Sequence, residues 1–564
     1  MSVSVWCETV VGESGVENDV RFETDGAGRI VRRASEQPAR PGDLRLGTVV
    51  AGAGNAHSHA FHRVLRGRTH DDGGDFWRWR DSMYAVAGSL EPESYFALAR
   101  AVFAEMLTAG YTAVGEFHYL HHRLDGSPYP HEFERALAAA AAATGIRLTL
   151  LDTAYLQAAP GRPLEPAQRR FGDRDAAAYL SRWYALRELV PSLGAAVHSV
   201  RAVPPTAIAD IVAGLPPEVP LHVHLSEQPR ENTEVRAAYG VSPTRLLADL
   251  GALSARTSVV HATHLDDADI ALIGAAGAGV VMCPTTEADL GDGIGPARAL
   301  RDAGAVLAVG SDQHAVIDPF LELRALEMHE RLASGRRGVF TPAELLAASA
   351  SGSYRALGWG EPRRDSTSLH VGDLLDLVEL AVDTVRTVGA RPGQLPLVAT
   401  AADVRRVLVG GRVVADSGML AGGAHPADLL RDALAQLDRG HPASVRADAP
   451  ARAEVPGRAD APARAEVPGR AEVPGRAEVP GRPEVPAGGE VPAGGDAPAG
   501  GEVPDGGDAP AGGDAPARID ASGTVASAGT ELSARTEEPG GAPEPTGASA
   551  RPNTPGVTEP GGTA

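Results

Sequence analysis

Two histidines separated by one residue, His57 and His59, are the first candidates for chemistry in this sequence. They follow an apolar run, and side chains two positions apart on a β-strand point to the same side. Two imidazoles on one side of a strand can occupy neighbouring corners around one metal ion. The pair therefore indicates a metal site, provided that distant parts of the chain supply further ligands.

Other polar residues stand at the ends of strand-like apolar runs. In residues 221–227, strand alternation places His222 and His224 on one face, and Glu227 follows directly after the run. We take His224 as the third ligand, although His222 competes for this position and the pattern alone does not decide. Asp312 ends a later run and adds a carboxylate that could bind the ion and accept a proton from its water. These donors suit one zinc ion, although iron or manganese could bind the same set.

The elements that must position these residues form a regular alternation. From residue 48 onward, strand-like segments alternate with helical ones, among them helices at 92–109 and 176–190. We expect barrel strands at 49–55, 112–117, 146–153, 193–199, 219–226, 258–263, 279–284 and 306–311. This alternation predicts an α/β fold, a (β/α)8 TIM-like barrel, whose active site lies where the strand ends converge. Side chains expected there also include His118, Tyr119, His198, His261 and His264.

Runs near both ends of the globular chain predict a second, smaller domain. Short strands are expected at 20–24 and 28–32, and later at 373–378 and 404–414, the last as a hairpin through Gly410 and Gly411. Together they predict a small β-sandwich. The expected domains are residues 1–50 and 361–440 for the two halves of the β domain, the second with a closing helix, and 51–360 for the barrel. Residues 441–564 are Pro/Gly/Ala-rich repeats that we expect to be a disordered tail.

Composition excludes several classes of protein. The formal charge of −21 disfavours nucleic-acid binding, since phosphates repel an acidic surface. The chain contains no lysine, which excludes Schiff-base chemistry, a P-loop and a carboxylated-lysine metal bridge. Two cysteines and no charged apolar leader favour the cytoplasm, and no apolar run approaches the roughly 20 residues of a membrane span. A homodimer is the default expectation for such a barrel enzyme.

The complete set of motifs resembles the amidohydrolase superfamily in its mononuclear deaminase branch. The matching positions are His57-x-His59, His224-x-x-Glu227, His261 and Asp312. The missing lysine fits this branch, because the binuclear branches commonly bridge two metals with a carboxylated lysine. Residues 76–80, 115–122 and 198–201 further resemble the formiminoglutamate deiminases of histidine breakdown. The resemblance extends from the start of the chain to about residue 440.

The resemblance implies a substrate, a reaction and a role for each residue. Formiminoglutamate plus water would give N-formyl-L-glutamate and ammonia, with a hydroxide on the metal attacking the formimino carbon. Glu227, His261 and Asp312 would transfer protons. The implied ligands of one divalent ion, zinc, are His57, His59, His224 and Asp312, and the implied substrate-binding residues are His62, Arg80, Tyr119, His198 and Arg201. His62 stands where these enzymes usually have glutamine.

Two other functions compete with this interpretation. One is another deaminase of the same branch, acting on guanine, cytosine or an adenosine-type ring. The other is a noncatalytic binding protein that stores metal on its histidines and works through its tail.

Several residues have simpler interpretations. Arg80 could merely stack on Trp77 or Trp79 in a loop that these tryptophans anchor. Cys283 is expected to be an inert core residue. His118, His121 and His122 could be extra ligands, but a second metal would need a bridging group that the chain does not provide, so we place them behind the ligands or on the surface.

Overall fold

A computed structural model of the chain describes residues 2–70, 76–359 and 369–440. The predicted disordered tail beyond residue 440 and the side chain of Trp77 lie outside what is described. Two eight-stranded sheets organise the described residues, and they belong to one compact unit. The predicted domain boundaries near residues 50 and 360 therefore stay a prediction.

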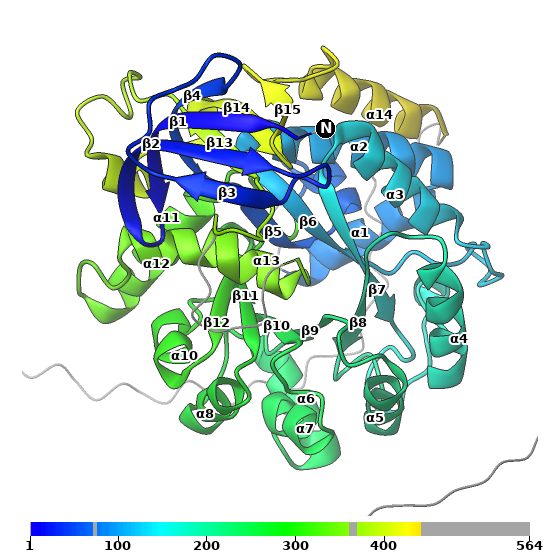
Figure 1. Ribbon diagram of the computed structural model, residues 1–564. Coiled ribbons are helices and arrows are strands. Elements are labelled where there is room, and N and C mark those ends of the chain that lie inside the picture. The colour runs from blue at the N-terminus through cyan, green and yellow to red at the C-terminus, as the bar shows by residue number, and fades with distance from the viewer. Residues whose placement is uncertain (1, 71–75, 360–368, 441–564) are drawn as a thin grey trace, which may run out of the picture. The chain divides into compact units, whose positions relative to one another are not determined.

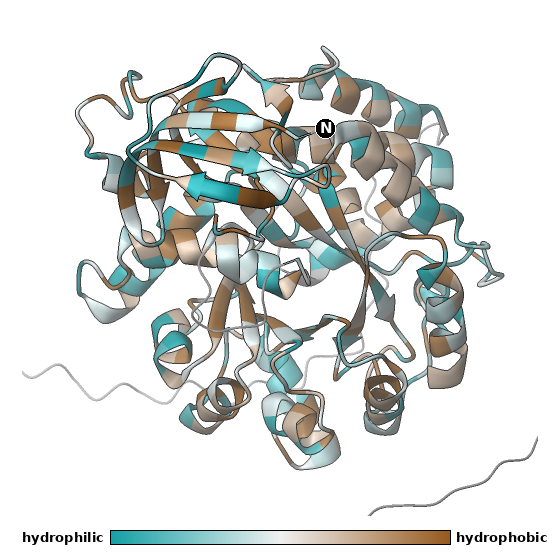
Figure 2. Ribbon diagram, viewed as in Figure 1, coloured by the Kyte–Doolittle hydropathy of each residue, from teal (hydrophilic) through white to brown (hydrophobic). Residues whose placement is uncertain are grey.

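One sheet is a parallel barrel in the order β5 to β12, enclosed by helices (Figure 1). Its strands are β5 (Ala53–Ser58), β6 (Tyr111–His118), β7 (Arg147–Ala154), β8 (Leu193–Ser199), β9 (Leu221–Leu225), β10 (Thr257–His261), β11 (Gly279–Met282) and β12 (Val306–Val309). Because these strands are covered on both faces, their sequences are nearly continuous apolar runs, as the brown β11 and β12 in Figure 2 illustrate. The predicted barrel is confirmed.

Helices follow the strands around the barrel. They are α1 (Phe76–Ser89), α2 (Pro92–Ala109), α3 (Glu132–Thr144), α4 (Ala176–Arg187), α5 (Pro205–Gly214), α6 (Pro229–Tyr239), α7 (Pro243–Asp249), α8 (Asp267–Ala275), α9 (Pro284–Leu290), α10 (Ala297–Ala303), α11 (Pro319–Ser334), α12 (Pro342–Ala347), α13 (Ser353–Ala356) and α14 (Pro426–Gly440). Helix α2 has the predicted bounds, because Pro92 occupies its first turn and Gly110 ends it in a left-handed conformation. In the described residues, no helix is long and apolar enough to span a membrane.

The barrel closes where β12 meets β5. The Asp312 amide donates to the His57 carbonyl at 3.0 Å, and the His59 amide donates to the Asp312 carbonyl at 3.1 Å. Gly310 makes this approach possible, since a Cβ at this position would lie 2.8 Å from the Cβ and carbonyl oxygen of His57. The closure thus fixes two of the predicted metal-binding segments against each other.

The predicted first barrel strand at 49–55 is wrong in its bounds. Residues 49–51 belong to β4 (Leu44–Ala51) of the other sheet, and the barrel begins only at β5. The chain changes sheets at Gly52, where a Cβ would lie 2.2 Å from the Thr112 hydroxyl oxygen. A single glycine is too brief a break to be recognised within an otherwise apolar run.

The second sheet joins both ends of the described chain in the order β16-β15-β14-β13-β4-β1-β2-β3. Its remaining strands are β1 (Ser4–Gly12), β2 (Gly15–Thr24), β3 (Ile30–Ala34), β13 (Leu377–Leu380), β14 (Val404–Val409), β15 (Arg412–Asp416) and β16 (Met419–Leu420). Apolar residues of β1 to β4 share one core with Leu377 and Leu408 of β13 and β14. The strands of the predicted β-sandwich thus form one continuous sheet built from both ends of the globular chain. The predicted hairpin is present, and Gly410 and Gly411 both have positive φ.

Candidate active site

The four predicted metal-binding side chains meet at the carboxyl end of the barrel. The Nε2 atom of His57 lies 3.1 Å from Nε2 of His224 and 3.4 Å from Oδ1 of Asp312. Nε2 of His59 lies 3.4 Å from the same carboxylate oxygen. Segments more than 250 residues apart in the sequence thus place four donor atoms around one point.

Two of these imidazoles are held with a lone pair toward that point. The Nδ1 atom of His59 lies 2.8 Å from the Phe117 carbonyl, and Nδ1 of His224 lies 2.9 Å from the His198 carbonyl. A carbonyl oxygen can only accept a hydrogen bond, so each Nδ1 carries the hydrogen. Each Nε2 then has a free lone pair that can bind a cation. In both residues the hydrogen bond therefore selects the tautomer that can bind a metal.

The spacing fits a tetrahedral ion. Bonds of about 2.0–2.1 Å at tetrahedral angles place ligand atoms about 3.3–3.4 Å apart. The observed separations of 3.1 to 3.4 Å match this value. His57, His59 and Asp312 form one group of possible ligands, and His57 also brings His224 beside it, so zinc or another ion of similar size suits this set.

Burial keeps the histidines neutral, as metal ligands must be. It lowers the pKa of His57, His59 and His224 far below the ordinary value, and neighbouring imidazoles lower each of them further. Burial has the opposite effect on the carboxyl of Asp312, whose pKa it raises, and the charge of His261 partly offsets this. The site concentrates imidazole nitrogen and carboxylate oxygen where water has little access.

Two groups beside the four donors, His261 and Glu227, could move protons together with Asp312. Nε2 of His261 lies 3.7 Å from Oε1 of Glu227 and 3.9 Å from Oδ2 of Asp312. Burial would lower the pKa of His261, but the charge of Glu227 and a hydrogen bond with Glu287 raise it to about 10. Burial raises the pKa of Glu227. The pair thus combines a histidine that holds its proton at neutral pH with a carboxyl group that loses its proton at a higher pH than an ordinary glutamate does.

The backbone adopts unfavourable conformations at these strand ends. Ser226, His261 and Asp312 have φ values of 50°, 68° and 40°. Left-handed backbone costs a non-glycine residue roughly 1–2 kcal/mol and persists only where surrounding contacts enforce it. At Asp312 these contacts are the two hydrogen bonds to β5 that close the barrel.

A pocket that opens to solvent lies above the cluster. All five predicted substrate-binding residues line it: His62, Arg80, Tyr119, His198 and Arg201. Nε2 of His62 lies 3.0 Å from the hydroxyl of Tyr119. Two arginines therefore face the same cavity as the cluster, and a guanidinium fork suits a carboxylate.

Three interpretations need correction. Arg80 and Trp79 are not in a loop but on α1, and the Arg80 guanidinium lies over Tyr84, 5.5 Å from the ring centre. The predicted stacking on Trp77 falls on a side chain outside the described residues. His222 does not join the cluster, because its Nε2 contacts the Ala356 carbonyl at 2.8 Å. A surface position for the three histidines after β6 is wrong, since His118, His121 and His122 are all buried. Cys283 is a buried residue, as predicted.

The sequence interpretation missed several residues around the pocket. Tyr84, Tyr155 and Glu231 line it, and Glu287 hydrogen-bonds Nδ1 of His261 at 3.4 Å. Tyr155 directly follows β7, so the rule that strand ends form the site could have identified it. Glu231 stands four residues after Glu227, one helical turn further. Tyr84 and Glu287 carry no signal that separates them from ordinary helical residues.

Comparisons with known proteins agree with this geometry. Residues 48–414 match the Amidohydrolase family. The formimidoylglutamate deiminase of Pseudomonas aeruginosa is 35% identical over 77% of this chain and 99% of its own length. A 5-methylthioadenosine/S-adenosylhomocysteine deaminase of Natronomonas pharaonis is 28% identical over 65% of this chain and 81% of its own. The crystal structure of an amidohydrolase from Brucella melitensis, 32% identical, superposes with a TM-score of 0.71 and covers 77% of this chain and 99% of that chain.

The chain belongs to the amidohydrolase family. It is therefore a hydrolase that acts on carbon–nitrogen bonds of the amidine type, and its substrates are small molecules. Members of this family depend on a metal ion, and the donors around His57 are a candidate site for it.

Proposed function

We propose that this enzyme hydrolyses N-formimino-L-glutamate to N-formyl-L-glutamate and ammonia, as a step in histidine degradation. The observation that carries the proposal is the presence of Arg80 and Arg201 in the pocket above the histidine and aspartate cluster. The substrate has two carboxylates, and each arginine can bind one with a paired hydrogen bond. The similarity to the Pseudomonas aeruginosa enzyme supports the same substrate.

In this proposal His57, His59, His224 and Asp312 hold one divalent ion, zinc. When bound, such an ion acts as a Lewis acid that lowers the pKa of a water molecule toward neutrality. Asp312 is placed to take the proton that this water gives up, and His261, which holds its own proton, is placed to stabilise negative charge on the attacking oxygen. The lone pairs of His59 and His224 that face the ion support this assignment.

The remaining residues guide the substrate and the leaving group. Arg80 and Arg201 hold the two carboxylates, while His62, Tyr119 and His198 line the path to the formimino carbon. Glu227 then gives a proton to the departing nitrogen, so that ammonia leaves and a carbonyl forms on the carbon. Protonation matters because a neutral amine leaves far more readily than an amide ion.

A direct assay tests the proposal. The purified chain, with its metal content measured, should release ammonia from formiminoglutamate faster than from guanine, cytosine or adenosine. Faster release of ammonia from guanine, cytosine or adenosine would instead favour a deaminase of ring substrates. The similarity to the Natronomonas pharaonis enzyme supports this alternative. Ammonia release by a chain ended at residue 443 would refute the noncatalytic alternative that works through the tail.

We also propose that the enzyme is located in the cytoplasm, that it forms a homodimer and that it does not bind nucleic acid. The formal charge of −21 supports the last of these.

A further inference from the structure

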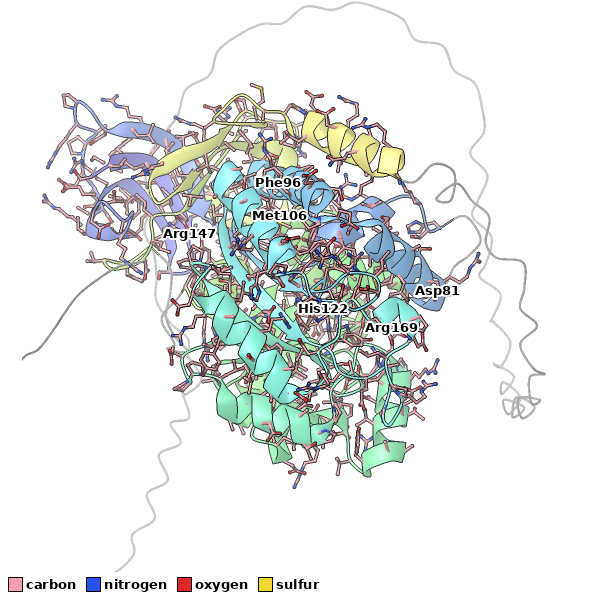
Figure 3. All side chains as sticks on the ribbon, turned by 90° about the vertical axis from the view of Figure 1, so that its right-hand side faces the viewer. Asp81, Phe96, Met106, His122, Arg147 and Arg169 are labelled. Carbon is pink, nitrogen blue, oxygen red and sulfur yellow. The ribbon has the colours of Figure 1, made fainter. Side chains whose placement is uncertain are left out.

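A second group of metal-binding side chains lies outside the barrel wall. His118 ends β6, His121 follows three residues later, and Glu134 projects from α3. All three are at most 1% exposed. Figure 3 views the molecule from the side of α3 and α4 and labels the neighbouring His122. The group lies on the side of β6 away from the active site: His118 stacks on Tyr95 of α2, whereas Phe117, one residue earlier, contacts the rings of His57 and His59.

The donor atoms are spaced for a metal ion. Nδ1 of His121 lies 2.9 Å from Oε1 of Glu134, and Nε2 of His118 lies 3.6 Å from the same oxygen. The three donor atoms all lie within 4.8 Å of one another. These values bracket the separation of about 3.3–3.4 Å expected between ligands of a tetrahedral ion.

The tautomer of His121 turns a lone pair toward the Glu134 carboxylate. Its Nε2 lies 3.0 Å from the Thr153 carbonyl and must donate to it, as in histidines that bind metal through the other nitrogen. In a neutral ring, Nδ1 then carries a lone pair that faces the Glu134 carboxylate at 2.9 Å. Nη1 of Arg182 lies 3.2 Å from the same Nδ1 and donates to it, so this nitrogen is held in the form that can also bind a metal ion.

Several polar atoms here have no hydrogen-bond partner among the described residues. They include both ring nitrogens of His118, Oε2 of Glu134 and Oδ2 of Asp152. Buried polar groups are nearly always paired, and a cluster of exceptions points to a bound ion or water. Protonation of His121 alone would leave both His118 nitrogens unsatisfied.

Charge balance also favours a cation. Three buried carboxylates, those of Glu134, Asp152 and Asp173, surround one guanidinium, that of Arg182. Arg182 is engaged by Asp152 at 2.6 Å and by Asp173 at 2.8 Å. With neutral histidines the cluster keeps two negative charges, which are costly to bury unless they are compensated. One divalent ion would neutralise them.

We propose that His118, His121 and Glu134 form a second, structural zinc site on the outer side of the barrel wall. Two imidazoles and a carboxylate are typical zinc ligands, and the Thr153 carbonyl orients one of them. The ion would tie α3 to the end of β6. It would therefore stiffen the strand whose Phe117 carbonyl fixes the tautomer of His59.

Zinc counting tests this proposal independently of the substrate. The full chain is equilibrated with Zn²⁺, passed over a chelating resin to remove loosely bound ions, and its metal measured by mass spectrometry. We expect two zinc ions per wild-type chain. The double variant His118→Gln with Glu134→Gln should keep one, and so should the matched variant His59→Gln with Asp312→Asn, each having lost one imidazole and one carboxylate.

The two variants make the result decisive. One zinc per wild-type chain would overturn the proposal and leave protonated histidines or a buried water as the compensating species. Two zinc ions in His118→Gln with Glu134→Gln would overturn it as well. If His118→Gln with Glu134→Gln does not fold, the variant His59→Gln with Asp312→Asn decides. It should keep one zinc ion if the site outside the barrel exists and none if it does not.

Discussion

The substitution Gly310→Ala should weaken metal binding although it replaces none of the proposed ligands. The added Cβ would lie 2.8 Å from the Cβ and carbonyl oxygen of His57, whereas ordinary contacts begin at 3.4 Å, so β12 and β5 must separate by about 0.6 Å. Metal sites tolerate distance errors of only about 0.2 Å. Asp312, two residues further along, would lose its register against His57 and His59. We expect zinc affinity to fall about 10–100-fold and the free energy of unfolding by about 1–3 kcal/mol.

A competition titration with a chromophoric zinc chelator measures the affinity, and urea unfolding of the metal-free chain measures the stability. Gly26→Ala is a suitable control, because a Cβ at Gly26 meets no heavy atom within 4 Å. It should match the wild type in both measurements. Unchanged zinc affinity in Gly310→Ala would refute the argument that the approach of β12 to β5 sets the geometry of the site.

Three further predictions concern single residues. Arg201→Met should keep the metal but raise KM for formiminoglutamate, and the loss of kcat/KM in steady-state assays should correspond to about 2–5 kcal/mol of transition-state stabilisation. Unchanged kinetics would show that Arg201 does not bind the substrate. Glu227→Gln should bind zinc normally and release ammonia at least about 100-fold more slowly, whereas a wild-type rate would exclude Glu227 as the proton donor. Although burial favours the neutral acid, hydrogen bonds from Arg386 and Thr384 lower the pKa of Asp403 to about 2. Because this pKa is below the unfolded value of about 3.9, Asp403→Asn should lose about 1–2 kcal/mol of stability above pH 4. Denaturant unfolding should show that loss shrinking as pH falls toward 2, and a pH-independent difference would contradict it.

The sequence predicted the barrel well because its signals were physical and repeated. Parallel strands covered on both faces read as apolar runs, and polar residues such as His57, Glu227 and Asp312 stood out at their ends. Because the carboxyl ends of barrel strands converge on one face, the sequence alone predicts that these side chains lie together. Helix α2 was predicted to the residue, because proline and glycine mark its two ends.

Other features depended on three-dimensional contacts. Strand alternation could not separate His222 from His224, because both face the barrel interior and differ in depth and in hydrogen-bond partner. Tyr84 lines the pocket from α1, a helix whose position has no fixed relation to the strand pattern. The passage from β4 to β5 at Gly52 was missed because one residue separates two strands of different sheets.

The sheet that unites both ends of the described chain also imposes an order on synthesis. Strand β4 pairs with β13 from Leu377↔Ala51 to Leu380↔Thr48, so one edge of β4 can be satisfied only after more than 300 further residues have been translated. At about 5–20 residues per second, a ribosome needs roughly 15–65 s to deliver them. During that interval the nascent N-terminal hairpin presents an open, apolar edge, and an expression host with strong holdase chaperones should give a higher yield of folded enzyme.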